Sequence, residues 1–119
     1  MSYTLVTQPS IIPVPDNKLI EEYVGHVNTK NPNLSVAHMI APAFWTEPYQ
    51  TPEFDEVTIM IRGKMMIEIG EEVLTLSAGE VIFINKGTKV RYSNPFNEEN
   101  EYWAVCTPAF HPEQVHRES

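Results

Sequence analysis

The feature that most restricts the fold is a series of short apolar runs separated by glycines and other turn residues. Glycines at positions 63, 70, 79 and 87 divide the central part of the chain, and the runs between them are rich in valine, isoleucine and threonine. Short runs of this composition are typical of strands rather than helices. Many short strands with tight turns predict an all-β sandwich or barrel.

The strands that we expect share this composition and lie at 36–41, 54–62, 65–69, 73–76, 81–84, 89–93 and 102–107. In the run 57–61 both faces of the strand are largely apolar. One face can fill the barrel, and the other has to be covered by the N-terminal arm or by a second subunit. We therefore expect a homodimer.

The N-terminal part of the chain has a different character. Residues 8–16 contain three prolines and little periodicity, which indicates an extended arm. Asp16 or Asn17 is placed to cap a short helix that runs through Tyr23, and Gly25 is placed to end it.

The 119 residues are expected to form one domain in three parts. An arm and short helix (1–34) would pack on a barrel (35–107), and a polar tail (108–119) would pack outside that barrel. The chain contains a single cysteine, Cys106, so no internal disulfide can form. We expect Cys106 to be a buried small apolar residue, and we expect the protein to reside in a reducing cytoplasm.

The charge of the chain argues against two classes of partner. Acidic residues number 16 against 8 lysines and arginines, for a formal net charge of −8. Binding to nucleic acid or to an anionic membrane needs clustered basic residues, and the sequence has no such cluster. The N-terminus lacks the pattern of a signal peptide, and no apolar run approaches the ~20 residues of a membrane span.

One spacing pattern resembles a motif of the cupin superfamily. The second cupin motif reads G-x5-P-x-G-x2-H-x3-N. Gly79, Gly87 and Asn94 match it at the correct separations, whereas Asn85 replaces the proline and Val90 replaces the histidine. The spacing is retained although the metal-binding residue is not.

The first cupin motif, G-x5-H-x-H-x3,4-E-x6-G, is also incomplete. Glu56 keeps the carboxylate position and its distance to the following glycine. With the shorter gap, Gln50 and Pro52 occupy the two histidine positions; the longer gap would place Tyr49 and Thr51 there instead. Either alignment lacks histidine. The chain is loosely similar to small cupins of the ethanolamine-utilisation type, which lack the metal histidines.

This resemblance implies a cupin-type double-stranded β-helix, a jelly-roll barrel, to which we add the short N-terminal helix. It also implies that the usual set of three imidazoles and one carboxylate is lost, so we expect no cofactor. The alternative is a divalent metal held by Glu56, Gln50 and His38. A second alternative is a site of carboxylate oxygens drawn from a local acidic group, Glu47, Glu53, Asp55 and Glu56.

The expected site is a ligand pocket inside the barrel. If Val90 faces inward like the histidine that it replaces, Tyr92 does so too, because side chains alternate along a strand. Gln50, Glu56, Arg62 and Tyr92 are therefore the candidate ligand-binding residues. The roles of two tail histidines, His111 and His116, stay open.

Three functions compete. The first is binding of a small polar metabolite without a metal. The second is an enzyme of the isomerase, epimerase or lyase type, in which Glu56 is the catalytic acid or base because burial raises a carboxyl pKa. The third is a structural role in an oligomeric assembly.

Overall fold

A computed structural model describes residues 2–118, which form ten strands and one short 3-10 helix. The elements in chain order are β1 (Ser10–Ile11), β2 (Leu19–Val24), β3 (Ser35–Ala41), β4 (Trp45–Thr46), β5 (Asp55–Arg62), β6 (Lys64–Ile69), β7 (Glu72–Ser77), β8 (Val81–Ile84), β9 (Val90–Asn94), β10 (Asn100–Thr107) and η1 (Pro112–Gln114). The all-β prediction is confirmed, and β3 and the strands from β5 to β10 lie close to the predicted ranges, whereas β4 was not predicted.

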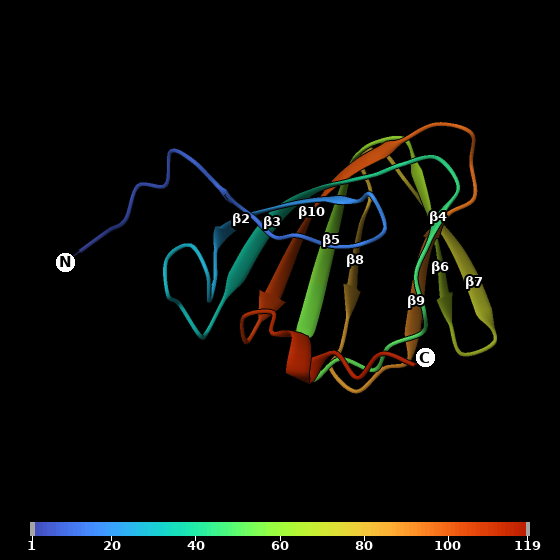
Figure 1. The fold of residues 1–119 in the computed structure, drawn as a ribbon. Helices are drawn as coiled ribbons and strands as arrows, with labels where there is room; N and C mark the ends of the chain where they lie inside the picture. Colours follow the sequence, from blue (N-terminus) through green and yellow to red (C-terminus); the bar gives the residue numbers. More distant parts are fainter. Residues whose placement is uncertain (1, 119) are drawn as a thin grey trace.

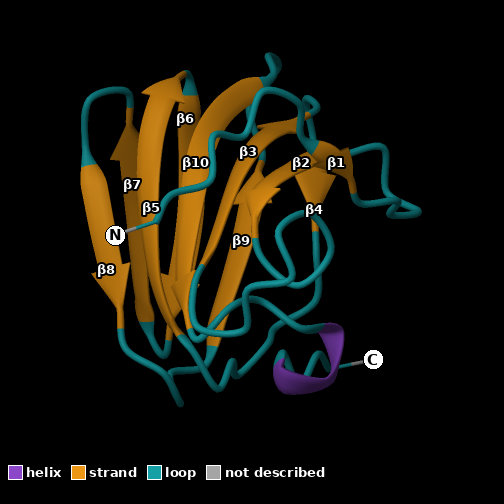
Figure 2. Cartoon of the chain, turned by 90° about the vertical axis from the view of Figure 1, so that its left-hand side faces the viewer, coloured by secondary structure: helices purple, strands orange, loops and turns teal. Residues whose placement is uncertain are grey.

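The strands form two antiparallel sheets that face each other (Figures 1 and 2). The larger sheet has the order β1-β2-β3-β10-β5-β8, and the smaller has the order β4-β9-β6-β7. Strands distant in sequence therefore lie side by side, as β10 does between β3 and β5. This arrangement is the expected jelly-roll barrel.

Alternation along the strands separates the interior from the outer surface. In β5, Thr58 and Met60 are buried at about 1% exposure, whereas Ile61 on the opposite face is 47% exposed. The core between the sheets includes Met65 and Ile67 of β6, which are fully buried. Burial of each such aliphatic side chain contributes about 1.5–3 kcal/mol to folding.

The turn between β5 and β6 needs its glycine. Gly63 has a φ of +78°, and a Cβ at this position would lie 3.1 Å from the carbonyl oxygen of Glu99 and 3.2 Å from Asn100. Any other residue would combine an unfavourable backbone conformation with crowding against the strand entry of β10.

The predicted N-terminal helix is wrong, because that segment forms β2. Its backbone pairs with β3, and β1 extends the same sheet. Ile20 and Glu22 face the barrel interior, so the segment follows a period of two. Asp16 does not cap a helix: its carboxylate accepts hydrogen bonds from the backbone amide of Lys18 (3.3 Å) and from the indole of Trp45 (2.8 Å).

The C-terminal tail does not stay outside the barrel. Backbone amides join it to the loop before β5, from Thr51 to the carbonyl of Val115 (3.0 Å) and from Glu118 to the carbonyl of Tyr49 (2.8 Å). Val115 is buried at 3% exposure. The tail therefore helps to close one mouth of the barrel. Within residues 2–118, no helix has the length and apolar character needed to cross a bilayer.

Candidate ligand-binding cavity

A cavity of about 290 Å³ lies between the sheets at the end of the barrel that the N-terminal arm and the C-terminal tail cover. Most of its wall is apolar. The polar side chains that matter most for its chemistry are Lys18, Glu47, Gln50, Glu56, Tyr92 and Tyr102. The cavity thus contains three of the four residues predicted from the sequence, namely Gln50, Glu56 and Tyr92.

Glu56 and Tyr92 form the central pair of the cavity. The hydroxyl of Tyr92 on β9 donates a hydrogen bond to Oε1 of Glu56 on β5, at 2.8 Å. The thiol of Cys106 on β10 lies 3.8 Å from Oε2 of the same carboxyl. As predicted, Cys106 is buried, and this burial together with the nearby Glu56 raises the pKa of its thiol. It is therefore held as a neutral thiol.

Burial decides the protonation of this pair. It raises the pKa of Glu56 above its usual value of 4.5, and the hydrogen bond from Tyr92 and the charge of Lys18 only partly oppose this rise. Burial, followed by the proximity of Glu56, also raises the pKa of Tyr92 well above 10.0. The pair can therefore hold a proton at a carboxyl that faces the cavity.

Lys18 brings a cation into the same cavity. It precedes β2, and its Nζ lies 4.4 Å from the centre of the Trp45 ring and 5.2 Å from that of Tyr102. Burial by itself would lower the pKa of Lys18, but Tyr102, Glu47 and Glu56 together raise it above 10.5. Its ammonium is therefore charged. Burial also raises the pKa of Tyr102, to about 12.

Glu47 and the tail complete the polar wall. Glu47 is buried, and its Oε2 lies 3.6 Å from a terminal nitrogen of Arg117. Burial raises the pKa of Glu47, and the cations of Lys18 and Arg117 oppose this rise. Arg117 Nε also donates to the side-chain oxygen of Gln50 at 3.4 Å. The tail thus holds two cavity residues in place.

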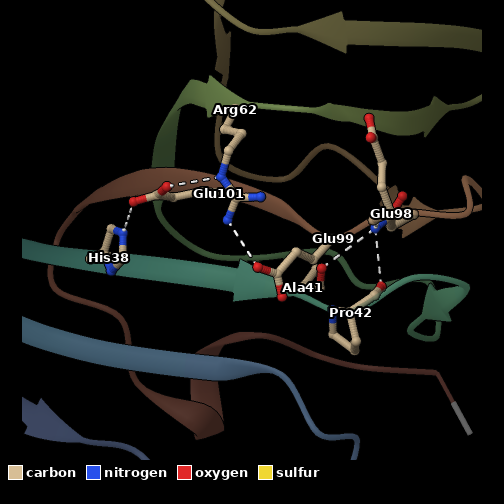
Figure 3. Close-up of polar contacts among 8 residues, drawn as sticks. His38, Ala41, Pro42, Arg62, Glu98, Glu99 and Glu101 are labelled. Atoms are coloured by element: carbon tan, nitrogen blue, oxygen red, sulfur yellow. Dashed lines mark hydrogen bonds and ion pairs between the residues drawn. The ribbon is translucent and has the colours of Figure 1, made fainter.

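The structure does not bring Arg62 to the cavity. Its guanidinium pairs with Glu99 at 3.1 Å and with Glu101 at 3.4 Å on the outer face (Figure 3). The physical reason is a register shift between β5 and β10. Tyr102 pairs with Met60, but its neighbour Glu101 pairs with Arg62, so one extra residue of β5 lies between the two pairs. An irregularity of this kind reverses the alternation for the residues that follow it.

His38, the histidine proposed as a metal ligand, also lies on the outer face. Its ring nitrogens contact Glu21 at 2.8 Å and Glu101 at 2.6 Å, and its ring packs on Trp103. These contacts hold its position and raise the pKa of His38 against the opposing effect of burial. His38 therefore does not share a site with Glu56 and Gln50.

The remaining acidic and histidine candidates are dispersed. Glu53 pairs with His116 at the surface, and Asp55 accepts a hydrogen bond from the backbone amide of Lys86 at 2.8 Å. His111 caps η1, and its ring packs edge-on against that of His26. The acidic group of residues 47–56 therefore does not converge on one point: only Glu47 and Glu56 line the cavity.

Comparison with known families adds the decisive observation. The family model described as "Cupin domain" matches residues 38–106, which is more than half of the chain. The chain belongs to the cupin family.

Several solved structures share this architecture. The EutQ protein of Clostridium difficile is 26% identical, with a TM-score of 0.62 over 79% of this chain and 70% of that one. A cupin from Methanocaldococcus jannaschii is 15% identical, with a TM-score of 0.68 over 87% of this chain and 93% of that one. A structure of Streptomyces PAC13 with uridine is 12% identical, with a TM-score of 0.77 over 100% of this chain and 92% of that one.

One curated relative has higher identity. A protein of Myxococcus xanthus named endoribonuclease YbeY is 45% identical over 109 residues, which is 92% of this chain. The chain spans 37% of the length of that relative.

The donor set does not fit the metal that cupins commonly hold. Gln50 and Val90 pair through their backbones at 2.9 Å, so these two motif positions do meet in the fold. Their side chains are an amide and a buried alkyl group, and Pro52 offers no ligand atom. Among these motif positions, only Glu56 has a side chain that is a strong metal ligand, and its carboxyl accepts a hydrogen bond from Tyr92. Across residues 2–118, no three His, Cys, Asp or Glu side chains are grouped to hold a metal ion.

Three charged residues that line the cavity, Lys18, Glu22 and Arg117, were not predicted from the sequence. Lys18 was overlooked because it fell in the supposed helix cap, although Lys18, Ile20 and Glu22 alternate as in a strand. Arg117 carried no local signal at all, because only the folding back of the tail brings it to Glu47 and Gln50.

Proposed function

We propose that this cupin binds a small polar organic metabolite inside the barrel, without a transition metal, and that Gln50, Glu56 and Tyr92 contact it. The observation that carries this proposal is a partly buried carboxyl, Glu56, that faces a cavity of about 290 Å³ and is held by Tyr92 at 2.8 Å. Apolar walls with a few convergent polar groups are the usual composition of a small-molecule site.

A thermal-shift screen of small polar metabolites, run in the presence of EDTA, tests the proposal. Hits on the wild-type protein are then titrated against Glu56→Gln and against Glu99→Gln. Both changes replace a carboxylate by an amide, but Glu99 lies on the outer surface. We expect Glu56→Gln to weaken binding about tenfold or more, since a ligand group left without its hydrogen-bond partner in the cavity costs about 1–3 kcal/mol. Equal affinity for all three proteins would remove Glu56 from the site.

A second candidate function is catalysis of the isomerase, epimerase or lyase type. The raised pKa of Glu56 suits proton transfer, and the Lys18 ammonium in the same cavity suits a developing negative charge. NMR of a screening hit in D₂O tests this. Exchange or loss of a carbon-bound hydrogen that requires Glu56 supports catalysis, and an unchanged spectrum supports binding alone.

We also propose a homodimer. Ile61, Val81 and Phe83 are 47–59% exposed on the outer face of the larger sheet, and Tyr3 and Leu5 of the N-terminal arm are 91% and 78% exposed. Apolar groups of this size favour association. Light scattering should give twice the mass of the chain, and a monomeric mass at every concentration would contradict the proposal.

A cytoplasmic location is proposed because the only cysteine is a buried thiol. Nucleic acid is not proposed as a partner, because the formal net charge is −8.

A further inference from the structure

Lys18 is the cation of the cavity wall that takes part in no ion pair with the described residues, whereas Arg117 is paired with Glu47. Its ammonium lies over the rings of Trp45 and Tyr102, and none of the ion pairs among residues 2–118 includes it. The carboxylates of Glu47 and Glu56 and the aromatic faces keep this ammonium charged, and in the described part of the chain it has no direct ion-pair partner of its own.

The carboxylates around the cavity are already engaged. Glu47 pairs with Arg117 at 3.6 Å, and Glu56 accepts the hydroxyl of Tyr92. Glu22 accepts backbone amides from the following turn, those of residues 27 and 28, at 2.9 and 2.7 Å. Within the described residues, each acidic group therefore has its own donor, and the Lys18 ammonium is left to face the cavity.

Building on the ligand-binding role proposed above, we propose that the ligand is a small organic monocarboxylate and that its carboxylate group binds Lys18 beside Tyr102. The ammonium would donate charge-assisted hydrogen bonds to the carboxylate, and this pairing would compensate both desolvated charges. The carbon part of the ligand would lie against the apolar wall, which includes Ile12, Val14 and Ala104.

The surroundings favour a single negative charge. Of the two cations among residues 2–118 that line the cavity, Arg117 already pairs with Glu47, so a second negative charge on the ligand, as on a phosphate ester, would have no cation to pair with. Phosphate sites usually present several backbone amides from a glycine-rich loop, and no glycine lines this cavity. A volume of about 290 Å³ also limits the ligand to a small molecule.

The test compares carboxylates with amides of the same shape. Benzoate, butyrate and lactate are titrated by calorimetry against benzamide, butyramide and lactamide, in EDTA, on the wild-type protein. We expect at least one carboxylate to bind about tenfold or more tightly than its amide. Lys18→Met should abolish this preference, and Lys18→Arg should retain part of it. Lys64→Met is the matched control, because Lys64 also lies over an aromatic ring, that of Phe96, but outside the cavity.

The outcomes separate this inference from the proposed function. If a carboxylate and its amide bind equally tightly, the monocarboxylate inference is overturned. If Glu56→Gln weakens the binding of both, the proposed ligand-binding cavity is still supported. Carboxylate binding that survives Lys18→Met would overturn the role of Lys18. If none of the six probes binds, the inference fails, whereas neutral screening hits that depend on Glu56 would still support the cavity. If Lys18→Met does not fold, the test compares the preference for carboxylate over amide in the wild type with that in Lys18→Arg, which should retain part of it.

Discussion

Two groups of ionisable side chains lie on opposite sides of the larger sheet. The cavity group consists of Lys18, Glu47, Glu56 and Tyr92, and the outer-sheet network consists of His38, Arg62, Glu99 and Glu101. Tyr102 and Glu101 are neighbours on β10, yet the first lines the cavity and the second is the centre of the network. A single step along a strand therefore separates a desolvated environment from a hydrated one.

The environments act on carboxyl groups in opposite directions. In the cavity, burial raises the pKa of Glu56 and of Glu47. On the outer face, hydrogen bonding from His38 and Arg62 lowers the pKa of Glu101. Desolvation therefore dominates the carboxyl pKa inside the barrel, and partner charges dominate it outside. Chemistry that depends on a neutral carboxyl is therefore restricted to the cavity.

The largest effect is expected at Tyr92. Tyr92→Phe removes the hydroxyl that donates to Glu56 and leaves a partly buried carboxyl oxygen without this donor. We expect a loss of about 1–3 kcal/mol in the free energy of unfolding, measured by urea denaturation. Tyr23→Phe is the control, because Tyr23 packs on Trp103 at the outer face. Equal losses for the two variants would mean that the Tyr92 hydroxyl makes no special contribution.

A second prediction concerns pH and Glu56. Because the pKa of Glu56 is raised in the folded state, the folded protein binds more protons than the unfolded chain above pH 4.5. Stability should therefore fall as the pH rises from about 4.5 to the folded pKa, by at most about 1.4 kcal/mol per pH unit from this residue. Glu56→Gln removes this loss.

Urea denaturation between pH 4 and 8 measures the effect. The difference in unfolding free energy between Glu56→Gln and the wild type should grow in favour of the variant over this window and then become constant. A difference that does not change with pH would show that Glu56 has an ordinary pKa in the fold.

A third, smaller effect is expected in the outer-sheet network. The pKa of His38 is raised above 6.5, so its charged form contributes stability that is fully present below pH 6.5 and is lost as the pH rises through the folded pKa. His38→Gln should remove this dependence, and moderate salt should reduce it. A pH profile of unfolding that is identical in wild type and variant would show that the contacts with Glu21 and Glu101 do not stabilise the imidazolium.

The smallest effect is expected at Arg62. Arg62→Gln should leave the affinity of any cavity ligand unchanged, because the guanidinium pairs with Glu99 and Glu101 on the outer surface. The measurement is the same titration that is used for Glu56→Gln. A loss of affinity in Arg62→Gln would show that the two regions are coupled.

Much of the barrel was predictable from local patterns. The turn residues and the composition of the runs predicted β3 and the strands from β5 to β10, and the motif spacing identified Glu56 and Val90 as the positions of metal ligands in other cupins. Alternation then placed Tyr92 beside Glu56. These predictions succeeded because they depend on the period of a strand and on chain distances that the family retains.

The failures have non-local causes. Residues 19–24 form a strand because β3 offers a partner, and the period of a short segment did not distinguish the two structures clearly. The misplacement of Arg62 follows from a register shift that depends on β10. Arg117 reaches the cavity only through the pairing of the tail with residues 49–53. None of these contacts leaves a pattern within a single segment.

The most direct test of the central claim is a chemical-shift map of ligand binding. The ¹⁵N-labelled protein, dialysed against EDTA, is titrated with the strongest hit from the metabolite screen. We expect the largest shifts at residues that line the cavity, such as Glu56, Tyr92 and Tyr102, and we expect the same map after zinc, manganese or iron is added. Shifts centred on His38 and Glu101, or shifts that require an added metal, would contradict a metal-free binding site inside the barrel.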